Sequence, residues 1–489
     1  MPDTTPSLDS TFPTMSIPLE NVLNQDGALI ENHVFDEITL GQEARSVRTL
    51  TLDDIRAFAA VSGDTNPAHL DAGYAESTPF HGVIAHGMWG GSLISAVLGT
   101  QFPGPGTIYL EQALHFRRPV RVGDTLTTSV RVVAKDAERK QVTLDCDITN
   151  QQGDQVLRGS ARVLAPTRKV RHRLRAAPTI QLFDPQARLQ ELIALSAGLA
   201  VTRCAVVHPC DAASLQGALE CARLGIMHPL LVGPPARIAQ VAEEAELDLG
   251  GCEIEPVAHS HAAAQRAAEL AASGAVDSLM KGSLHTDELM HAVLAQRGLR
   301  TGRRCSHVFR FDVPSYHKPL LLTDAALNIA PSLAEKVDIV QNAIEFSCLL
   351  GTTRPKVAIL SAVETVSPSL PSSLDAAALC KMADRGQIVG GVLDGPLGFD
   401  NAISEAAARI KGIDSPVAGD ADVLLVPDLE SGNMLAKQLE YLGGAMSCGV
   451  VLGAKVPIAL TSRADGTRSR IGSAVLARLV AHHNRMVGR

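Results

Sequence analysis

A carboxylate and an imidazole lie five residues apart in the segment VSGDTNPAHLDAGYA, which covers residues 61–75. Asn66 and Pro67 are typical of a helix start, with Asn66 as the N-cap and Pro67 in the first turn. Asp64 then lies on the entering loop, and His69 lies in the first turn. Such a pair can hold one water molecule and move its protons. The alternative for the pair taken alone is structural, with Asp64 as an extra cap and His69 as a surface group.

A second set of polar residues follows short apolar segments in the carboxyl-terminal half. Ser462 and Arg463 offer a hydroxyl and a planar guanidinium, which suit a phosphate group. The segment 427–433 leads into a helix that we predict over 434–442, and its first amides suit another anion. Ligands bind at the carboxyl ends of parallel strands, so we expect one crevice. Its polar residues would be Lys281, Asp324, Ser361, Asp394, Asp428, Ser462 and Arg463. Each loop taken singly also fits an ordinary polar connection.

Different elements must position the two sites. Alternating segments at 129–133 and 141–148 predict antiparallel strands, and the unbroken apolar segment 86–98 predicts a buried helix. Together they favour an α+β domain. Farther along, short apolar strands alternate with amphipathic helices, which predicts an α/β domain with a doubly wound parallel sheet. Ser332 and Glu335 predict a capping box at one of its helices.

The composition shifts divide the chain into four parts. Residues 1–30 contain four prolines and little pattern, which predicts a flexible tail, and residues 31–165 form the first domain. Residues 166–184 are rich in Lys and Arg and are bounded by prolines, which predicts an exposed linker, with a basic track for an anionic ligand as the alternative. Residues 185–489 form the second domain.

Composition excludes several classes of function. Aromatic residues make up 3% and the net charge is −8, so we expect no nucleic-acid partner. No apolar run reaches the length of a membrane span, so no membrane partner is expected. Nine scattered cysteines without a C-x-x-C motif predict reduced thiols in a cytoplasmic protein. No P-loop, dinucleotide fingerprint or zinc motif is present, so we expect no bound metal and no permanent cofactor.

The amino-terminal motif F-x-x-V-S-G-D-x-N-P-x-H-x5-A resembles the signature of (R)-specific enoyl-CoA hydratases of the MaoC type. Residues 84–98 and 106–124 resemble the central helix of their hot-dog fold and the strand pair that follows it. The resemblance covers residues 35–165. It implies that Asp64 and His69 are the catalytic pair, that Gly87 provides an oxyanion donor through its backbone N–H, and that Asn66 and Ser95 lie near the substrate.

Residues 185–489 resemble the phosphate acetyltransferase and butyryltransferase family in segments 278–290, 392–404, 420–445 and 456–466. This resemblance implies a two-lobed α/β fold like that of isocitrate and isopropylmalate dehydrogenases. It also implies that Ser462 and Arg463 hold phosphate. Lys281, Asp394 and Asp428 lie in the segments that resemble the family, and from their places beside the predicted strands we expect them to contact substrate. Where the acetyl branch has an Asp, this chain has Ser469, so Asp465 is the candidate replacement and the assignment of the base stays open.

The two resemblances together imply a fusion of two enzymes whose substrates are coenzyme A thioesters and phosphate. One half would hydrate a trans-2-enoyl-CoA to an (R)-3-hydroxyacyl-CoA, and the other would exchange an acyl group between CoA and phosphate. One alternative is an active hydratase with a non-catalytic, CoA-binding or oligomerising carboxyl-terminal half. Another is a hot-dog thioesterase or binding module, which would not need the Asp–His pair. Both families form dimers, so we expect a homo-oligomer with dimer contacts in both domains.

Overall fold

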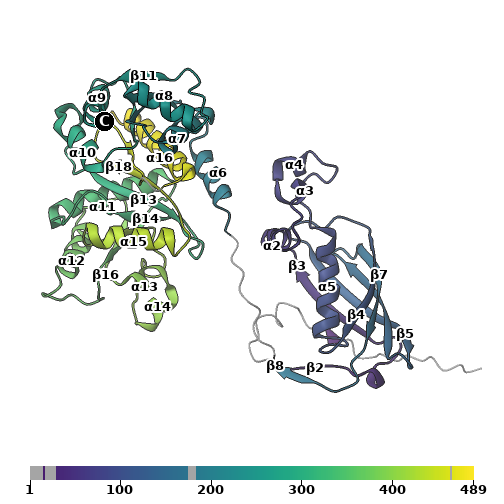
Figure 1. Cartoon of the computed structure of the whole chain (residues 1–489). Helices are drawn as coiled ribbons and strands as arrows, with labels where there is room; N and C mark the ends of the chain where they lie inside the picture. Colours follow the sequence, from purple (N-terminus) through teal and green to yellow (C-terminus); the bar gives the residue numbers. More distant parts are fainter. Residues whose placement is uncertain (1–14, 17–28, 174–182, 463–464, 489) are drawn as a thin grey trace, which may run out of the picture. The chain divides into compact units, whose positions relative to one another are not determined.

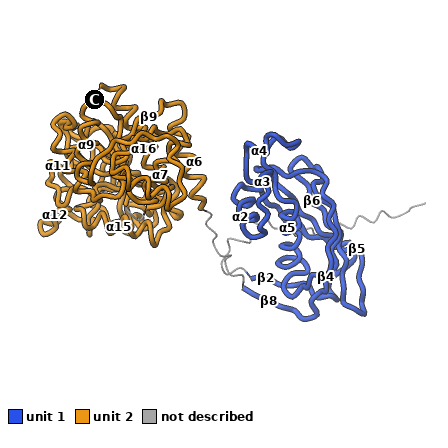
Figure 2. The backbone as a smooth tube through the Cα atoms, turned by 45° about the horizontal axis from the view of Figure 1, so that its top comes forward, with its two compact units in different colours: residues 1–182 blue, residues 183–489 orange. Residues whose placement is uncertain are grey.

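The computed structural model describes residues 15–16, 29–173, 183–462 and 465–488. The chain divides into two compact units, residues 1–182 and 183–489 (Figure 2). Within the described part of the chain, no helix combines the length and apolarity needed to cross a membrane.

The first unit is an antiparallel sheet with one long helix packed against it (Figure 1). The helix α5 (Gly87–Thr100) places Leu93, Ile94 and Val97 in the core, where they meet buried side chains of the sheet. The strands in sheet order are β1 (Met15–Ser16), β3 (Glu43–Thr49), β5 (Thr125–Asp136), β6 (Gln141–Thr149), β7 (Gln155–Leu164) and β4 (Ile108–Phe116), of which β1 runs parallel to β3. The shorter helices are η1 (Phe35–Glu37), α2 (Leu52–Ser62), α3 (Pro67–Leu70) and α4 (Ala72–Glu76).

Part of the predicted tail and part of the predicted linker belong to the first unit. Strand β2 (Leu29–Glu31) pairs antiparallel with β8 (Arg171–Arg173). Lys169 forms ion pairs with Glu31 and Glu37, and Arg171 pairs with Glu31. Residues 171–173 are therefore strand rather than linker, because nearby carboxylates pair with the basic side chains. The rest of the linker, 174–182, and residues 1–14 and 17–28 lie outside the described residues.

The second unit is built on one sheet of eleven strands with helices α6–α16 around it (Figure 1). Its strands in sheet order are β11 (Glu253–Pro256), β10 (Met227–Gly233), β9 (Thr202–Val207), β12 (Ser278–Lys281), β19 (Ile458–Ala459), β18 (Met446–Leu452), β13 (Ser306–Asp312), β14 (Leu320–Thr323), β17 (Val423–Leu425), β15 (Lys356–Leu360) and β16 (Val392–Leu397).

The helices of the second unit include the predicted capping box, in which Ser332 and Glu335 open α11. The helix predicted over 434–442 begins earlier, because Asp428 accepts a hydrogen bond from the Ser431 N–H and caps α15. The helices are α6 (Pro185–Leu195), α7 (Ala212–Arg223), α8 (Pro235–Glu244), α9 (Ser260–Ala272), α10 (Thr286–Ala295), η2 (Arg297–Leu299), α11 (Leu333–Leu349), α12 (Pro371–Asp384), α13 (Phe399–Ile403), α14 (Glu405–Ile410), α15 (Leu429–Tyr441) and α16 (Thr467–Met486).

The large sheet is mixed, which corrects the expectation of a parallel one. Strand β13 pairs antiparallel with both β14 and β18, and β18 pairs antiparallel with β19. The strands β14, β17, β15 and β16 therefore run opposite to β11, β10, β9, β12 and β19. The sequence analysis did not identify β13 or β18, so it missed the reversal.

This reversal also bears on the expectation of one crevice, because that expectation assumed strands of a single direction. Lys281 is the last residue of β12 and Ser462 follows β19, and these two strands are parallel neighbours. Asp324, Ser361 and Asp428 follow β14, β15 and β17, which run in the opposite direction. Asp394 lies within β16 rather than at its end. The predicted residues thus follow strands of both directions rather than one row of parallel carboxyl ends.

Candidate active sites

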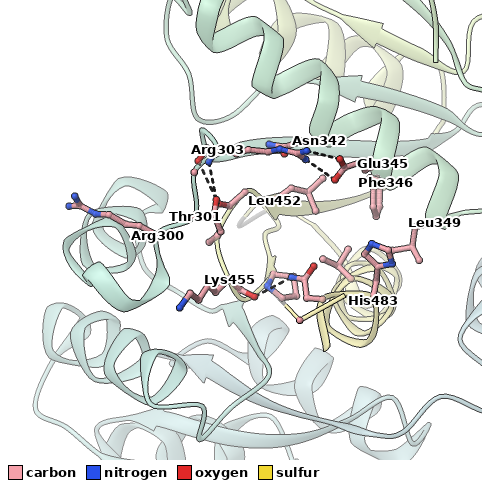
Figure 3. A pocket seen from close by; sticks show the side chains of 17 residues that line it. Arg300, Thr301, Arg303, Asn342, Glu345, Phe346, Leu349, Leu452, Lys455 and His483 are labelled. Atoms are coloured by element: carbon pink, nitrogen blue, oxygen red, sulfur yellow. Dashed lines mark hydrogen bonds and ion pairs between the residues drawn. The ribbon is translucent and has the colours of Figure 1, made fainter. Parts of the chain in front are cut away.

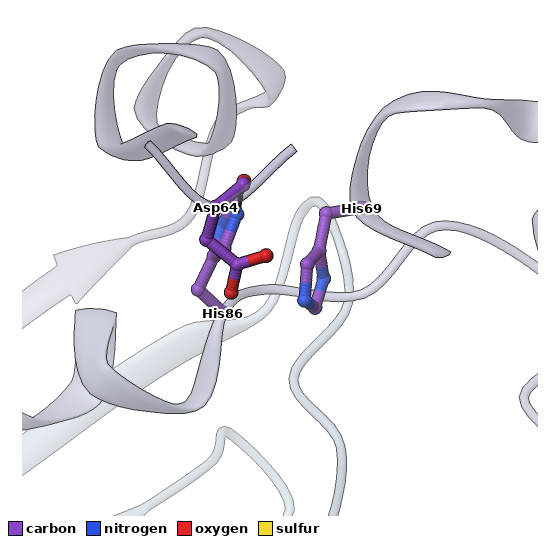
Figure 4. A group of neighbouring side chains, drawn as sticks. All are labelled: Asp64, His69 and His86. Carbon is purple, nitrogen blue, oxygen red and sulfur yellow. Dashed lines mark hydrogen bonds between the residues drawn. The ribbon is translucent and has the colours of Figure 1, made fainter. Parts of the chain in front are cut away.

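The loop before α3 places Asp64 beside His69. Asn66 caps this helix by accepting a hydrogen bond from the Ala68 N–H at 3.1 Å, and Pro67 occupies the first helical position, as the sequence predicted. Asp64 Oδ1 accepts a hydrogen bond from the Asn66 N–H at 3.2 Å. Figure 4 shows the Asp64 carboxylate directed toward the His69 ring. The second carboxylate oxygen of Asp64 is therefore available for another partner.

The backbone fixes the tautomer of His69. Its Nδ1 lies 2.8 Å from the carbonyl oxygen of Ile84. A carbonyl oxygen can only accept, so Nδ1 carries the proton and donates it. The lone pair on Nε2 is then free to accept a proton from a water molecule or a substrate.

His86 is a third member of this group that the sequence analysis did not single out. Its ring lies 3.9 Å from the ring of His69, measured between centroids, and its Nε2 donates to the Asp64 carbonyl oxygen at 2.9 Å. Its Nδ1 is buried and has no hydrogen-bond partner within the described part of the chain. The only sequence signal was its position as the first residue of the segment 86–98, which we predicted as a buried helix.

The three side chains also form a set that fits a metal ion. Asp64, His69 and His86 each offer one ligand atom, and these atoms lie within 4.8 Å of one another. Two imidazoles and one carboxylate are a donor set that divalent transition metals accept. The same set suits a water molecule, because it combines acceptors with a charged group.

A cavity of about 330 Å³ opens beside these residues. Gly87 begins α5 at its wall, and no side chain caps this end of the helix. The first N–H groups of a helix lack intrahelical partners, so they can donate to an oxygen in the cavity. Trp89 is buried and also lines the cavity. Ser95 is exposed on the same helix and is not among the lining residues.

Ser462 and Asp465 lie between the carboxyl end of β19 and the start of α16, and they are in direct contact. The Ser462 N–H donates to Asp465 Oδ2 at 2.7 Å. Burial raises the pKa of the Asp465 carboxyl, and the Ser462 hydrogen bond only partly opposes this shift. Lys281 is buried next to this loop, with its Nζ 3.4 Å from the Thr461 carbonyl oxygen. Arg463 lies outside the described residues.

Two further polar groups at this edge were missed by the sequence analysis. His208 follows β9, and its Nδ1 lies 3.1 Å from the hydroxyl of Ser283, which follows β12. Burial lowers the pKa of the His208 imidazole. The strands β9 and β12 are neighbours in the sheet, and only that pairing brings the two residues together.

The predicted residues elsewhere in the unit have structural partners. The Asp324 carboxylate accepts hydrogen bonds from the backbone of His307, Ala326 and Leu327. Asp428 caps α15, and Asp394 accepts a hydrogen bond from the Gly395 N–H. Nothing in these contacts requires a ligand.

A larger cavity of about 560 Å³ lies at the other end of β19 (Figure 3). The Arg303 guanidinium lines it and makes two 2.7 Å hydrogen bonds to the Glu345 carboxylate. None of the residues predicted from the sequence lines this cavity. It is therefore separate from the Ser462 loop.

The structure defines a protein of two units, each with its own candidate site. Comparison with known proteins identifies the family of each unit. The family model "MaoC like domain" matches residues 36–152, and the model "Phosphate acetyl/butaryl transferase" matches residues 258–478. The chain belongs to the phosphate acetyl/butyryl transferase family through its second unit, which is fused to a MaoC-like domain.

Three relatives illustrate the membership. A phosphate acetyltransferase of Rhizobium meliloti is 58% identical over 300 residues, which are 61% of this chain and 95% of that protein. A phosphate butyryltransferase of Clostridium acetobutylicum is 42% identical over 272 residues, which are 55% of this chain and 90% of that protein. The structure of a branched-chain phosphotransacylase from Enterococcus faecalis V583 is 33% identical with a TM-score of 0.51, and the match covers 57% of this chain and 98% of that one.

Proposed function

We propose that this chain carries two enzymes that act on coenzyme A thioesters. The first unit hydrates a trans-2-enoyl-CoA to an (R)-3-hydroxyacyl-CoA. The second unit catalyses the reaction of acyl-CoA with phosphate to give acyl phosphate and free CoA. The observation that carries the hydratase proposal is the free Nε2 lone pair of His69 beside Asp64, at the uncapped start of α5. The transferase proposal rests on the family membership of the second unit.

In the hydratase step, Asp64 orients a water molecule and His69 Nε2 takes one of its protons. The water oxygen bonds to C3 of the enoyl group, and the electron pair of the double bond moves onto the thioester oxygen. The N–H of Gly87 stabilises that oxygen, because hydrogen-bond donors aimed at developing charge lower the barrier. The proton on His69 then passes to C2, which restores the neutral imidazole and balances the reaction.

In the transferase step, a phosphate oxygen attacks the thioester carbonyl carbon and the CoA thiolate leaves. Ser462 and Arg463 hold the phosphate and the tetrahedral intermediate. Asp465 accepts the thiol proton in the reverse direction, which its raised pKa suits, since a stronger base takes a proton more readily. Lys281 adds positive charge near the same loop. We keep Asp394 and Asp428 as proposed substrate contacts from the sequence alone.

The hydratase proposal is tested by hydration of crotonyl-CoA with the full chain. Substituting Asp64→Asn or His69→Gln should lower kcat by about 10²- to 10⁴-fold, the usual contribution of a general acid or base. The control is Asp53→Asn, an exposed carboxylate on α2. Full activity in Asp64→Asn would overturn the proposal.

The transferase proposal is tested by phosphate-dependent release of free CoA from acetyl-, butyryl- and 3-hydroxybutyryl-CoA. Release should depend on phosphate and fall in Ser462→Ala and Arg463→Ala. A preference for the hydroxybutyryl substrate would link the two halves as consecutive steps. No release from any substrate, in a sample that hydrates crotonyl-CoA, would favour the alternative of a non-catalytic carboxyl-terminal unit.

We further propose a cytoplasmic homo-oligomer with contacts in both units. On the edge strand β4, Ile108 and Phe116 are 55% and 53% exposed. At the end of α15, Tyr441 and the next residue, Leu442, are 70% and 86% exposed. Exposed apolar groups of this kind favour contact with a second copy. All nine cysteines are free, as expected in a reducing compartment. We also propose two lobes, one on each side of the β13–β18 pair, as in the isocitrate dehydrogenase type of fold.

A further inference from the structure

Buried cations in the second unit are generally matched by partners within the chain. Arg310 pairs with Asp312, and Lys336 pairs with Asp375 at 2.6 Å. The guanidinium of Arg478, on α16, donates to the carbonyl oxygens of Leu199, Ala200 and Gly225. This matching is expected, because a buried charge without a partner is costly.

Arg470 departs from this pattern. It lies on the same helix as Arg478, and it is 2% exposed. Within the described part of the chain, its guanidinium makes one hydrogen bond, from Nη1 to the Thr461 hydroxyl at 3.0 Å. Its Nε is buried without a partner, and no carboxylate there forms an ion pair with it. The guanidinium therefore has donors, Nε among them, that the described residues do not satisfy.

The surroundings hold Arg470 in this position. Gly217 on α7 leaves room for it, since a Cβ there would lie 2.7 Å from Arg470 Cδ. Asp211, which caps α7, and Asp465 raise the pKa of Arg470 by their charge, but burial lowers it more. The two carboxylates thus interact with the guanidinium without compensating its burial.

The unsatisfied guanidinium lies at the proposed transferase site. Its single partner, Thr461, directly precedes Ser462 at the carboxyl end of β19. Asp465, which accepts the hydrogen bond of the Ser462 N–H, also interacts electrostatically with Arg470. The missing counter-charge is therefore beside the loop that the reaction requires.

We propose that Arg470 is a phosphate-binding residue of the transferase, and that the oxyanion of phosphate or acyl phosphate is its counter-ion. This inference rests on the proposed function. Arginine suits the role because its planar donors match two phosphate oxygens. The Thr461 hydroxyl orients the guanidinium, and the bound oxyanion accepts from the remaining donors.

The test compares Arg470→Met with Arg478→Met in the full chain. Arg470→Met should raise the KM for phosphate by about 10- to 100-fold, as expected for loss of hydrogen bonds to a charged group, and leave the KM for acyl-CoA nearly unchanged. Its thermal stability without phosphate should be unchanged or higher, because a buried unpaired charge is gone. Arg478→Met should lose thermal stability, because three carbonyl groups lose their donor, with no change in the KM for phosphate.

Two further measurements distinguish the outcomes. Phosphate should raise the melting temperature of the wild type and of Arg470→Lys, and it should raise that of Arg470→Met much less. If Arg470→Met loses stability and keeps the wild-type KM for phosphate, Arg470 is structural and the inference is wrong. If the wild type releases no CoA with phosphate, the proposed function fails first, and the melting experiment still reports whether Arg470 binds phosphate.

Discussion

The histidine that precedes α5 connects the two parts of the first site. His86 donates to the backbone of Asp64 and packs against the His69 ring. It therefore fixes the loop that carries Asp64 relative to the first turn of α3, which carries His69. Its own Nδ1 remains without a partner in a buried position. In the proposed reaction, these contacts give His86 a positioning role.

Gly87 provides a test of the proposed oxyanion donor. A Cβ at this position would lie 3.1 Å from Cε1 of Phe116, so Gly87→Ala must shift the start of α5 or the ring. We expect crotonyl-CoA hydration to fall about tenfold or more, since displaced oxyanion donors lose much of their effect. Phosphate-dependent CoA release should stay unchanged. The double variant Gly87→Ala/Phe116→Ala should recover part of the hydration, and no loss in Gly87→Ala would contradict the assignment.

Metal addition and removal test the role of the Asp64, His69 and His86 group. The proposed mechanism uses the free Nε2 of His69, so EDTA should leave hydration unchanged. Zn²⁺ should inhibit hydration by occupying the same donor atoms, which lie within 4.8 Å of one another. The substitution His86→Gln should weaken this inhibition. Loss of activity in EDTA that Zn²⁺ restores would instead make the group a metal centre.

At the scale of elements, the antiparallel strands β13 and β18 decide the geometry of the second unit. They separate two sets of parallel strands that run in opposite directions. His307 on β13 is fully buried at this junction, packed edge-on against Phe309. A Cβ on Gly449 of β18 would lie 2.5 Å from His307 Nε2, so the two strands fit closely around the ring.

The burial of His307 should make the second unit sensitive to acid. Burial lowers the pKa of the His307 imidazole, although the Asp324 charge opposes the shift. The unfolded chain therefore binds a proton at a pH where the folded chain does not, so stability falls as the pH drops below the ordinary histidine pKa of about 6.5. In urea unfolding at pH 7.5 and 5.5, His307→Gln should lose less stability between the two pH values than the wild type. An equal loss would show that another group is responsible.

At the scale of the whole molecule, each unit has its own hydrophobic core. The cluster around α5 contains residues of the first unit only, and the three other clusters contain residues of the second unit only. Compact units with separate cores can unfold independently, so one free energy of unfolding does not describe the chain.

We expect calorimetry of the full chain to resolve two transitions. Leu144→Ala should lower the free energy of unfolding of the first unit, and Leu215→Ala that of the second. Each loss should be about 2–5 kcal/mol, the usual cost of a cavity in a core, and each should shift only its own transition to a lower temperature. Both side chains are fully buried, Leu144 in the first unit and Leu215 in the second. If each substitution shifted both transitions equally, the two units would unfold as one.

The sequence by itself determined local features of both units. The Asn66 cap, the position of Pro67 and the capping box of α11 follow from side chains that bond to their own neighbouring backbone, so short-range pattern suffices. The buried helix α5 and the antiparallel strands β5 and β6 follow from apolar periodicity.

Only the tertiary structure decided which of these features meet. The order and direction of strands depend on contacts between segments far apart in the chain, so Asp324 and Ser462 follow strands that run in opposite directions. The pairing of His86 with Asp64 has the same origin, and so does the burial of Arg470 without an ion pair among the described residues. Spacing along the chain carries no information about partners across the fold, and the cost or gain of burying a charge depends on those partners.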